Sequence, residues 1–451
     1  MEQKLNIQKM NTNRNLFRMS IPIFIELLLQ LLVGNMDQIM ISHYSQDSSA
    51  AIVNANQIMN LVIIVLNMIS MGTSVVLSQY LGANDKENAT KTCMVSLTLI
   101  SGISIVITII VLGLNKRLFE LMNIEPKILS EATLFLIIVG AFILVQGLYL
   151  NFAAILRTFT FMKHVMIVSV IMNVLNIIGN AILINGLFGF PQMGISGSAT
   201  STVISKIIGL ALIIYIYRKK VALPLKLQYM KPFPTHILRK LCKIAFPSGV
   251  ESLSYNMSQL FILGIINTFG TMVTATKGYC SILANFSYVY AIAMAQASQI
   301  VLGYLLGAYE LDAIEKRVWN SVKVALSVCL GLTLVLLINS DLVFGAFTSN
   351  PEVHALGRRI LMIEFFLEIG RALNIVMTRA LIAVGDAKTP MVVGITGHWA
   401  IALLFAYLFG KVLGLGLEGV WIAMTMDECT RGFIYFIKFR QRKWKMALSE
   451  R

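Results

Sequence analysis

Two acidic residues within a long apolar stretch are the first candidates for chemistry in this sequence. Glu26 and Asp37 are 11 positions apart, and Gln30 follows Glu26 by one helical turn. In an α-helix this separation amounts to three turns, or roughly 16 Å along one face. Carboxylates in an apolar segment must face protein or water, where they bind cations, exchange protons or pair with basic groups. Asp37 is therefore a candidate for coupling to an ion. Glu26 and Gln30 are candidates for binding a substrate, with structural pairing as the alternative.

A row of polar side chains offers further ligands at helical spacing. It comprises Ser169, Asn173, Asn176 and Asn180 within one apolar run. Asparagines of this kind can hydrogen-bond between neighbouring helices as purely structural contacts. The functional alternative is that the amides of Asn176 and Asn180 ligate a cation beside Asp37 or receive its hydrogen bonds.

The second half of the sequence carries more charge in its apolar runs. Its candidates for binding a substrate are Glu251, Tyr255 and Gln259 on one helical face, and Glu364 and Glu368 on another. Glu251 has no basic residue nearby in sequence, which favours a role in binding a cationic substrate or a proton. Glu368–Arg371 and Asp427–Arg431 have the spacing of internal ion pairs, because pairing is the usual way to tolerate buried charge.

No motif indicates an enzyme or a cofactor. The GxGxxG pattern at 414–419 lies between two apolar runs and lacks a preceding strand, which argues against nucleotide binding. The five cysteines and five histidines form no metal-ligand spacing. We therefore expect no catalytic activity, no cofactor and no metal site beyond a Na⁺ ion at Asp37.

The elements that must position these residues are membrane helices. The chain is 57% hydrophobic and 13% charged over 451 residues, which excludes an ordinary soluble globular protein. Runs of about 20 apolar residues, enough to cross the hydrocarbon core, follow one another closely. They predict an all-α membrane protein with twelve spans. These cover 17–41, 52–80, 92–115, 129–155, 165–188, 197–217, 242–267, 277–304, 319–340, 356–382, 391–412 and 419–438.

The sequence also repeats itself at an offset of 225 residues. Pro22, Glu26, Gly82–Ala83 and Pro126 recur as Pro247, Glu251, Gly307–Ala308 and Pro351, and a slightly shifted register pairs Gly194 with Gly416. The chain is therefore two copies of one ancestral half. Because each half has six spans, the copies form a parallel repeat about an axis along the membrane normal. We predict lobes at 1–217 and 242–451, joined by a basic cytoplasmic linker at 218–241.

Basic residues predict the orientation of the spans. With the N-terminus inside, the cytoplasmic segments hold most of the lysines and arginines, including a basic tail after residue 437. The opposite loops hold only Lys116, Arg117, Lys127 and Lys411. This asymmetry places both termini in the cytoplasm. We expect the protein in the plasma (inner) membrane. The net charge of +15 is spread over short loops, which favours contact with membrane lipid over binding of nucleic acid.

Several stretches together resemble the bacterial type of the multidrug and toxic-compound extrusion (MATE) family. Pro22 and Asp37 match the early proline and the aspartate of the family's first span. The stretches SMGTSVVLSQYLGAND at 70–85 and ALIAVGDAKTP at 380–390 are similar to its turns after spans 2 and 10. Residues 174–199 resemble its fifth span, with Asn176 at the expected asparagine.

This resemblance implies two six-helix lobes that use no ATP and export organic cations or drugs against inward H⁺ or Na⁺, as a monomer. In the family, the first-span aspartate and its neighbours form a cation site, which carries over to Asp37, Asn176 and, less directly, Asn151. Asn180 departs from the family, since many members have a second acid there. Two alternatives on the same fold are a flippase for a lipid-linked precursor and an exporter of a specific metabolite.

Overall fold

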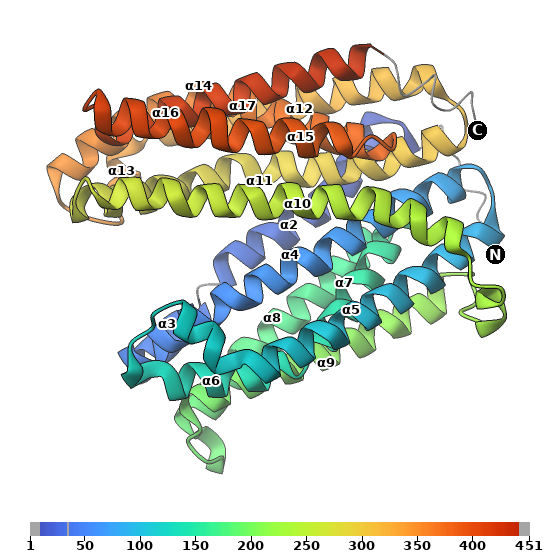
Figure 1. The fold of residues 1–451 in the computed structure, drawn as a ribbon, viewed down its shortest axis with the longest axis horizontal. Helices are drawn as coiled ribbons and strands as arrows, with labels where there is room; N and C mark the ends of the chain where they lie inside the picture. Colours follow the sequence, from blue (N-terminus) through green and yellow to red (C-terminus); the bar gives the residue numbers. More distant parts are fainter. Residues whose placement is uncertain (1–9, 34–35, 442–451) are drawn as a thin grey trace. The chain divides into compact units, whose positions relative to one another are not determined.

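The computed structural model describes residues 10–33 and 36–441, except for the side chains of residues 33, 36–38 and 227. Within this part the chain is almost entirely helical and contains no strand. In the part of the chain that the structure describes, each of the twelve ranges expected from the sequence lies on one helix or on consecutive helical segments (Figure 1). The predicted all-α membrane fold is confirmed.

The first six spans are built from eight helices and one short 3₁₀ turn. They are α2 (Asn13–Val33), α3 (Met36–Tyr44), α4 (Gln46–Gly82), α5 (Lys86–Leu121), α6 (Pro126–Gly140), α7 (Ile143–Thr158), α8 (Met162–Asn185), η1 (Leu187–Gly189) and α9 (Gly194–Lys220). The first expected span is divided between α2 and α3. The fourth is divided between α6 and α7, which meet at an angle of 49°.

The second half repeats this plan, with single helices, α10 and α14, where the first half has the pairs α2–α3 and α6–α7. After η2 (Leu227–Met230) come α10 (Thr235–Asn267), α11 (Thr271–Gly307), α12 (Leu311–Ile338), α13 (Ser340–Gly345) and α14 (Pro351–Ala383). The eleventh span comprises α15 (Lys388–Thr396), η3 (Gly397–Leu403), α16 (Leu404–Tyr407) and η4 (Leu408–Val412), and α17 (Gly416–Arg440) is the last helix. Both η3 and η4 are π-helical, so this span has two widened stretches.

The distribution of charge separates three helices from the other spans. Among the described residues, eight segments are long and apolar enough to cross a membrane, and the bent pair α6–α7 makes a ninth. The remaining spans are α10, α14 and α17, which carry the acidic candidates of the second half and the arginines that pair with them. Because such residues are rare in membrane spans unless they are functional or paired, these helices are where a polar site is expected.

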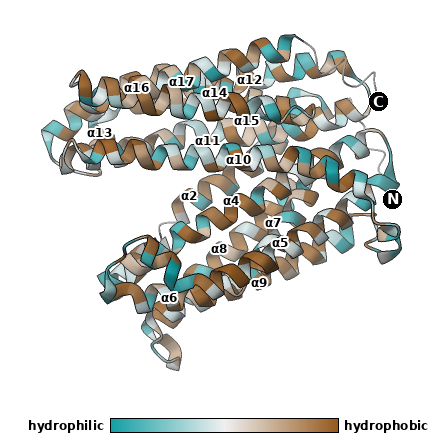
Figure 2. Cartoon of the chain, viewed as in Figure 1, coloured by the Kyte–Doolittle hydropathy of each residue, from teal (hydrophilic) through white to brown (hydrophobic). Residues whose placement is uncertain are grey.

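Apolar side chains cover the surfaces of the other helices. Ile105, Val106, Ile109 and Ile110 of α5 are 47–66% exposed, and Figure 2 shows hydrophobic residues along much of α5 and α9. A soluble protein would bury such a surface, whereas a lipid bilayer solvates it.

The chain divides into two compact units. One comprises residues 25–81 and 85–245, and the other comprises 1–24, 82–84 and 246–451. The division passes through α2 just after Pro22, a proline inside the helix. The lobe limits predicted at residues 217 and 242 stay a prediction.

A close helix crossing fixes the core of the second unit. There α14 packs against α11, α12 and α17 (Figure 1). At the crossing of α14 and α17, a Cβ added to Gly370 would lie 2.6 Å from the backbone nitrogen of Cys429. Glycine therefore lets the two backbones approach, as small residues commonly do between membrane helices. This approach brings the charged faces of α14 and α17 together.

Candidate functional site

The predicted ion site of the first unit centres on Asp37. The backbone of Asp37 lies in α3, and its side chain is outside the described part of the structure. The helix α3 packs against α8 and α9. Asn176 and Asn180 are buried on α8, so the fold brings the helices of this predicted site together. The ligation of an ion by these residues stays a prediction.

The buried asparagines of the first unit join neighbouring helices. Asn151 on α7 donates from Nδ2 to Ser96 Oγ on α5 at 3.0 Å. Asn176 on α8 donates to Thr202 Oγ1 on α9 at 3.2 Å. These bonds fit the structural reading of the asparagine row, because each links two adjacent spans. The side-chain amide oxygen Oδ1 of Asn151 is buried and has no hydrogen-bond partner among the described residues. It can therefore still accept a hydrogen bond.

Glu26 is engaged in an ion pair that the sequence did not reveal. Its Oε1 accepts a hydrogen bond from Nη2 of Arg157 at 2.6 Å, and only 4% of the Glu26 side chain is exposed. Arg157 lies at the end of α7, 131 positions later. Gln30, one turn further along α2, is exposed. The pairing favours a structural role for Glu26, and substrate binding by Glu26 or Gln30 stays a prediction.

In the second unit, the acids of α14 share one guanidinium. Nη1 of Arg371 donates to Glu364 Oε1 at 2.5 Å and also to Glu368. Both carboxylates are almost fully buried. Glu364 Oε2 further accepts from the indole nitrogen of Trp421 on α17 at 2.8 Å. The predicted Glu368–Arg371 pair is confirmed, and Glu364, at seven positions from Arg371, joins it on the same helical face.

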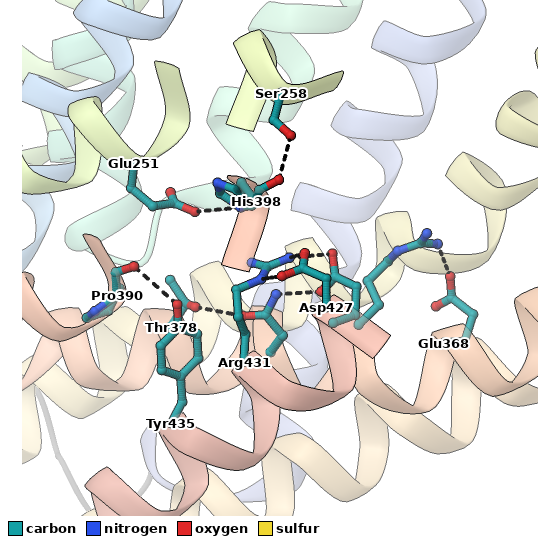
Figure 3. A network of polar contacts seen from close by, with 12 residues as sticks. Glu251, Ser258, Glu368, Thr378, Pro390, His398, Asp427, Arg431 and Tyr435 are labelled. Atoms are coloured by element: carbon teal, nitrogen blue, oxygen red, sulfur yellow. Dashed lines mark hydrogen bonds and ion pairs between the residues drawn. The ribbon is translucent and has the colours of Figure 1, made fainter. Parts of the chain in front are cut away.

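A second guanidinium is surrounded by acids of α17. Arg431 donates to Asp427 Oδ1 at 2.9 Å and to Oδ2 at 2.7 Å, which is a bidentate pair. Its Nη2 also lies 2.9 Å from Glu428 Oε1. Asn374 of α14 donates to the other oxygen of Glu428. The predicted Asp427–Arg431 pair is confirmed (Figure 3), and Glu428 connects it to α14 through Asn374.

Glu251 faces a histidine that the sequence analysis did not connect to it. Oε1 of Glu251 on α10 lies 3.9 Å from Nε2 of His398, the second residue of the π-helical stretch η3 in the eleventh span (Figure 3). The ring of Tyr255, one turn after Glu251, packs edge-on against the imidazole with centroids 5.2 Å apart. Gln259 is partly buried on the same helix. The five histidines do not cluster in the sequence, and Glu251 and His398 are 147 positions apart. Only the tertiary fold brings these two residues together.

These groups form one carboxylate cluster in the second unit. Its members are Glu251, Glu364, Glu368, Asp427 and Glu428, with Arg371, Arg379 and Arg431 as the cations. Arg379 of α14 donates to Gln299 of α11 at 3.2 Å and acts electrostatically on Glu251. Five carboxylates face three guanidiniums, so the described cluster has two formal negative charges in excess when all of these groups are ionised. Protons or a bound cation must offset such an excess in a buried place.

Comparison with known proteins identifies relatives over the whole chain. The MatE family profile matches residues 22–182 and 247–408. These two matches begin 225 positions apart, which is the offset of the internal repeat. An uncharacterized transporter, YisQ of Bacillus subtilis, is 37% identical over 95% of this chain and 94% of its own length. The probable multidrug resistance protein NorM of Thermotoga maritima is 24% identical over 96% of this chain and 93% of its own length.

Solved structures share the fold. A crystal structure of MATE in the bent conformation superimposes with a TM-score of 0.90 at 22% identity, covering 98% of both chains. A transporter of the MOP superfamily from Pyrococcus furiosus superimposes with a TM-score of 0.88 at 22% identity, covering 97% of this chain and 98% of its own. The likeness establishes a two-lobe, twelve-helix membrane fold for this sequence.

Proposed function

Because the chain belongs to the MatE family of membrane transporters, we propose that it is a secondary active antiporter that exports organic, mostly cationic, compounds. A role in transport and multidrug efflux is supported by the relatives of this chain. The observation that supports antiport of organic cations is the carboxylate cluster of the second unit. An excess of buried negative charge attracts a cationic compound and also binds the protons that such a compound would displace.

We propose H⁺ as the coupling ion, with Asp37 as the exchanging residue of the first unit. Binding of Na⁺ requires several anionic or carbonyl oxygens that replace its water. This chain has the amide Asn180 where many relatives carry an acid, as the sequence resemblance implies. A single carboxylate with nearby amides favours exchange of a proton over tight binding of a metal ion.

The test is efflux of a fluorescent organic cation from proteoliposomes. The H⁺ and Na⁺ gradients are imposed separately, with the membrane potential clamped at zero. We expect efflux to follow the H⁺ gradient, and the Asp37→Asn variant to lose this efflux while still inserting into the membrane. Efflux that follows Na⁺ alone would refute proton coupling, and undiminished efflux by Asp37→Asn would refute the role of Asp37.

A second candidate is export of a specific metabolite or a lipid-linked precursor. The structure from Pyrococcus furiosus is described with the words "Reverse polarity of binding pocket suggests different function", so the fold alone does not decide the charge of the substrate. In this chain the acids of the cluster outnumber its arginines, which favours a cation over an anionic precursor. Competition of the fluorescent cation by anionic compounds but not by cationic ones would favour this second candidate.

A further inference from the structure

His398 occupies a position that two glycines and a π-helix create. The side chain lies at the start of η3, where the wider turn shifts the helix relative to an ordinary α-helix. A Cβ on Gly394 would lie 2.9 Å from Cγ of Glu251, and one on Gly397 would collide with Asp427. The span therefore fits closely between α10 on one side and α17 on the other. The two glycines make room for the side chains that face His398.

The backbone of this turn is held in place, whereas the imidazole is not hydrogen-bonded. Ser258 of α10 donates to the carbonyl oxygen of His398 at 2.9 Å, and the indole of Trp399 donates to Ser254 at 3.0 Å. The His398 ring is 1% exposed, and both of its nitrogens lack a hydrogen-bond partner among the described residues. Buried polar groups in proteins are nearly always satisfied, so an unsatisfied ring suggests a second state in which it is bonded.

The nearest group that can satisfy it is the carboxylate of Glu251. The gap of 3.9 Å between Nε2 and Oε1 is longer than a hydrogen bond by about 1 Å, a shift that a rotation of the Glu251 side chain can supply. A proton bound by the pair, on either Nε2 or the carboxylate, would form that hydrogen bond. Its binding changes the net charge of the pair from −1 to 0.

The charged groups around the Glu251–His398 pair cancel one another in number. The titratable and charged groups that face it are Tyr255 on α10, Arg379 on α14, and Asp427, Glu428, Arg431 and Tyr435 on α17. Two arginines and two carboxylates in this set balance one another. The set and the pair together therefore carry one formal negative charge when the pair has no proton.

From this geometry we propose that Glu251 and His398 form a second proton-binding site, which loads and releases one proton in each transport cycle. This inference rests on the proposed proton-coupled antiport, and it sets the number of protons exchanged in each transport cycle at two. One proton would be exchanged at Asp37 in the first unit, and another at the Glu251–His398 pair in the second.

The experiment measures the substrate gradient that a fixed pH difference can sustain. Proteoliposomes carry a difference of one pH unit, valinomycin and equal K⁺ hold the potential at zero, and the final ratio of a fluorescent cation is recorded. Exchange of two protons sustains a ratio of about 100-fold, and exchange of one proton sustains about 10-fold. We expect about 100-fold for the natural sequence and about 10-fold for His398→Gln and Glu251→Gln, which both keep a polar side chain of similar size.

His354→Gln is the matched control. His354 on α14 bonds the carbonyl oxygen of Thr348 through Nε2 at 2.7 Å, far along the helix from the cluster. It should sustain the same ratio as the natural sequence. If His398→Gln and Glu251→Gln both keep the natural ratio, the second site is refuted while proton coupling stands. If the natural sequence responds to Na⁺ and ignores the pH difference, both proposals fall.

Discussion

The Glu26–Arg157 pair offers the most direct test of how this fold uses buried charge. The two side chains join α2 to the end of α7 with an N–O distance of 2.6 Å, and they are 4% and 21% exposed. Removing one partner of a buried pair leaves the other charge without compensation, which typically costs about 3–5 kcal/mol. Because Arg157 keeps some access to solvent, we expect Glu26→Gln to cost about 3 kcal/mol. This corresponds to roughly a 100-fold change in the folding equilibrium.

The double variant separates pairing from other effects of substitution. Glu26→Gln combined with Arg157→Gln leaves no buried charge alone, so it should be no less stable than either single variant. The free energy of unfolding is measured by SDS titration in mixed micelles, followed by circular dichroism. Lys91→Gln removes the exposed pair with Glu87 and serves as the control, with an expected loss below about 1 kcal/mol.

Two results would refute this reasoning. One is a loss in Glu26→Gln no larger than that in Lys91→Gln, and the other is a double variant whose loss equals the sum of the two single losses. Transport by the double variant then tests the predicted role of Glu26 in binding a substrate. A double variant that is stable but does not transport would support that role, whereas normal transport would leave the pair a purely structural one.

Three further predictions concern the ion site, the helix crossing and the topology. Asn180→Asp should increase the dependence of efflux on Na⁺, because a second carboxylate supplies the anionic oxygen that Na⁺ needs; an unchanged response to imposed Na⁺ would contradict this. Gly370→Ala should destabilise by about 1–3 kcal/mol in SDS titration, since its Cβ would lie 2.6 Å from the backbone of Cys429, whereas Gly264→Ala meets no atom within 4 Å and should not destabilise. In a cysteine-free variant of intact cells, a cysteine at residue 230 should be shielded from impermeant thiol reagents and one at residue 46 should react; labelling at 230 would overturn the orientation.

The spans could be predicted from sequence because membrane helices obey a simple length rule. Apolar runs of about 20 residues mark where the backbone must satisfy its own hydrogen bonds, and each of the twelve expected ranges is mostly helical over its described residues. The bends and π-helical stretches inside spans could not be predicted from the apolar runs. The bend of 49° between α6 and α7 and the π-helical stretches of the eleventh span leave the hydropathy of the sequence unchanged.

Ion pairs within one helix could also be predicted, and pairs between helices could not. Glu368–Arg371 and Asp427–Arg431 follow from spacings of three and four residues. Glu26 and Arg157 are 131 positions apart, and nothing local in the sequence links them. The same holds for Glu251 and His398, which belong to different spans. For residues on different helices, tertiary packing decides which carboxylates meet a guanidinium.

The internal repeat, however, contains a signal that could have located His398. At the offset of 225 it corresponds to Asn173, and in the shifted register of Gly194 and Gly416 it corresponds to Asn176. In either alignment the second half has a titratable imidazole where the first half has an amide of the asparagine row.

The two copies differ in the partner of one equivalent glutamate. Glu26 and Glu251 occupy equivalent positions four residues after a proline. In the first copy the carboxylate lies 2.6 Å from the guanidinium of Arg157, a partner whose charge does not depend on a proton near neutral pH. In the second copy it lies 3.9 Å from an imidazole, whose charge depends on a proton. On the proposed mechanism the second copy uses this acid for proton exchange, and the ratio measurements on Glu251→Gln and His398→Gln test that difference between the copies.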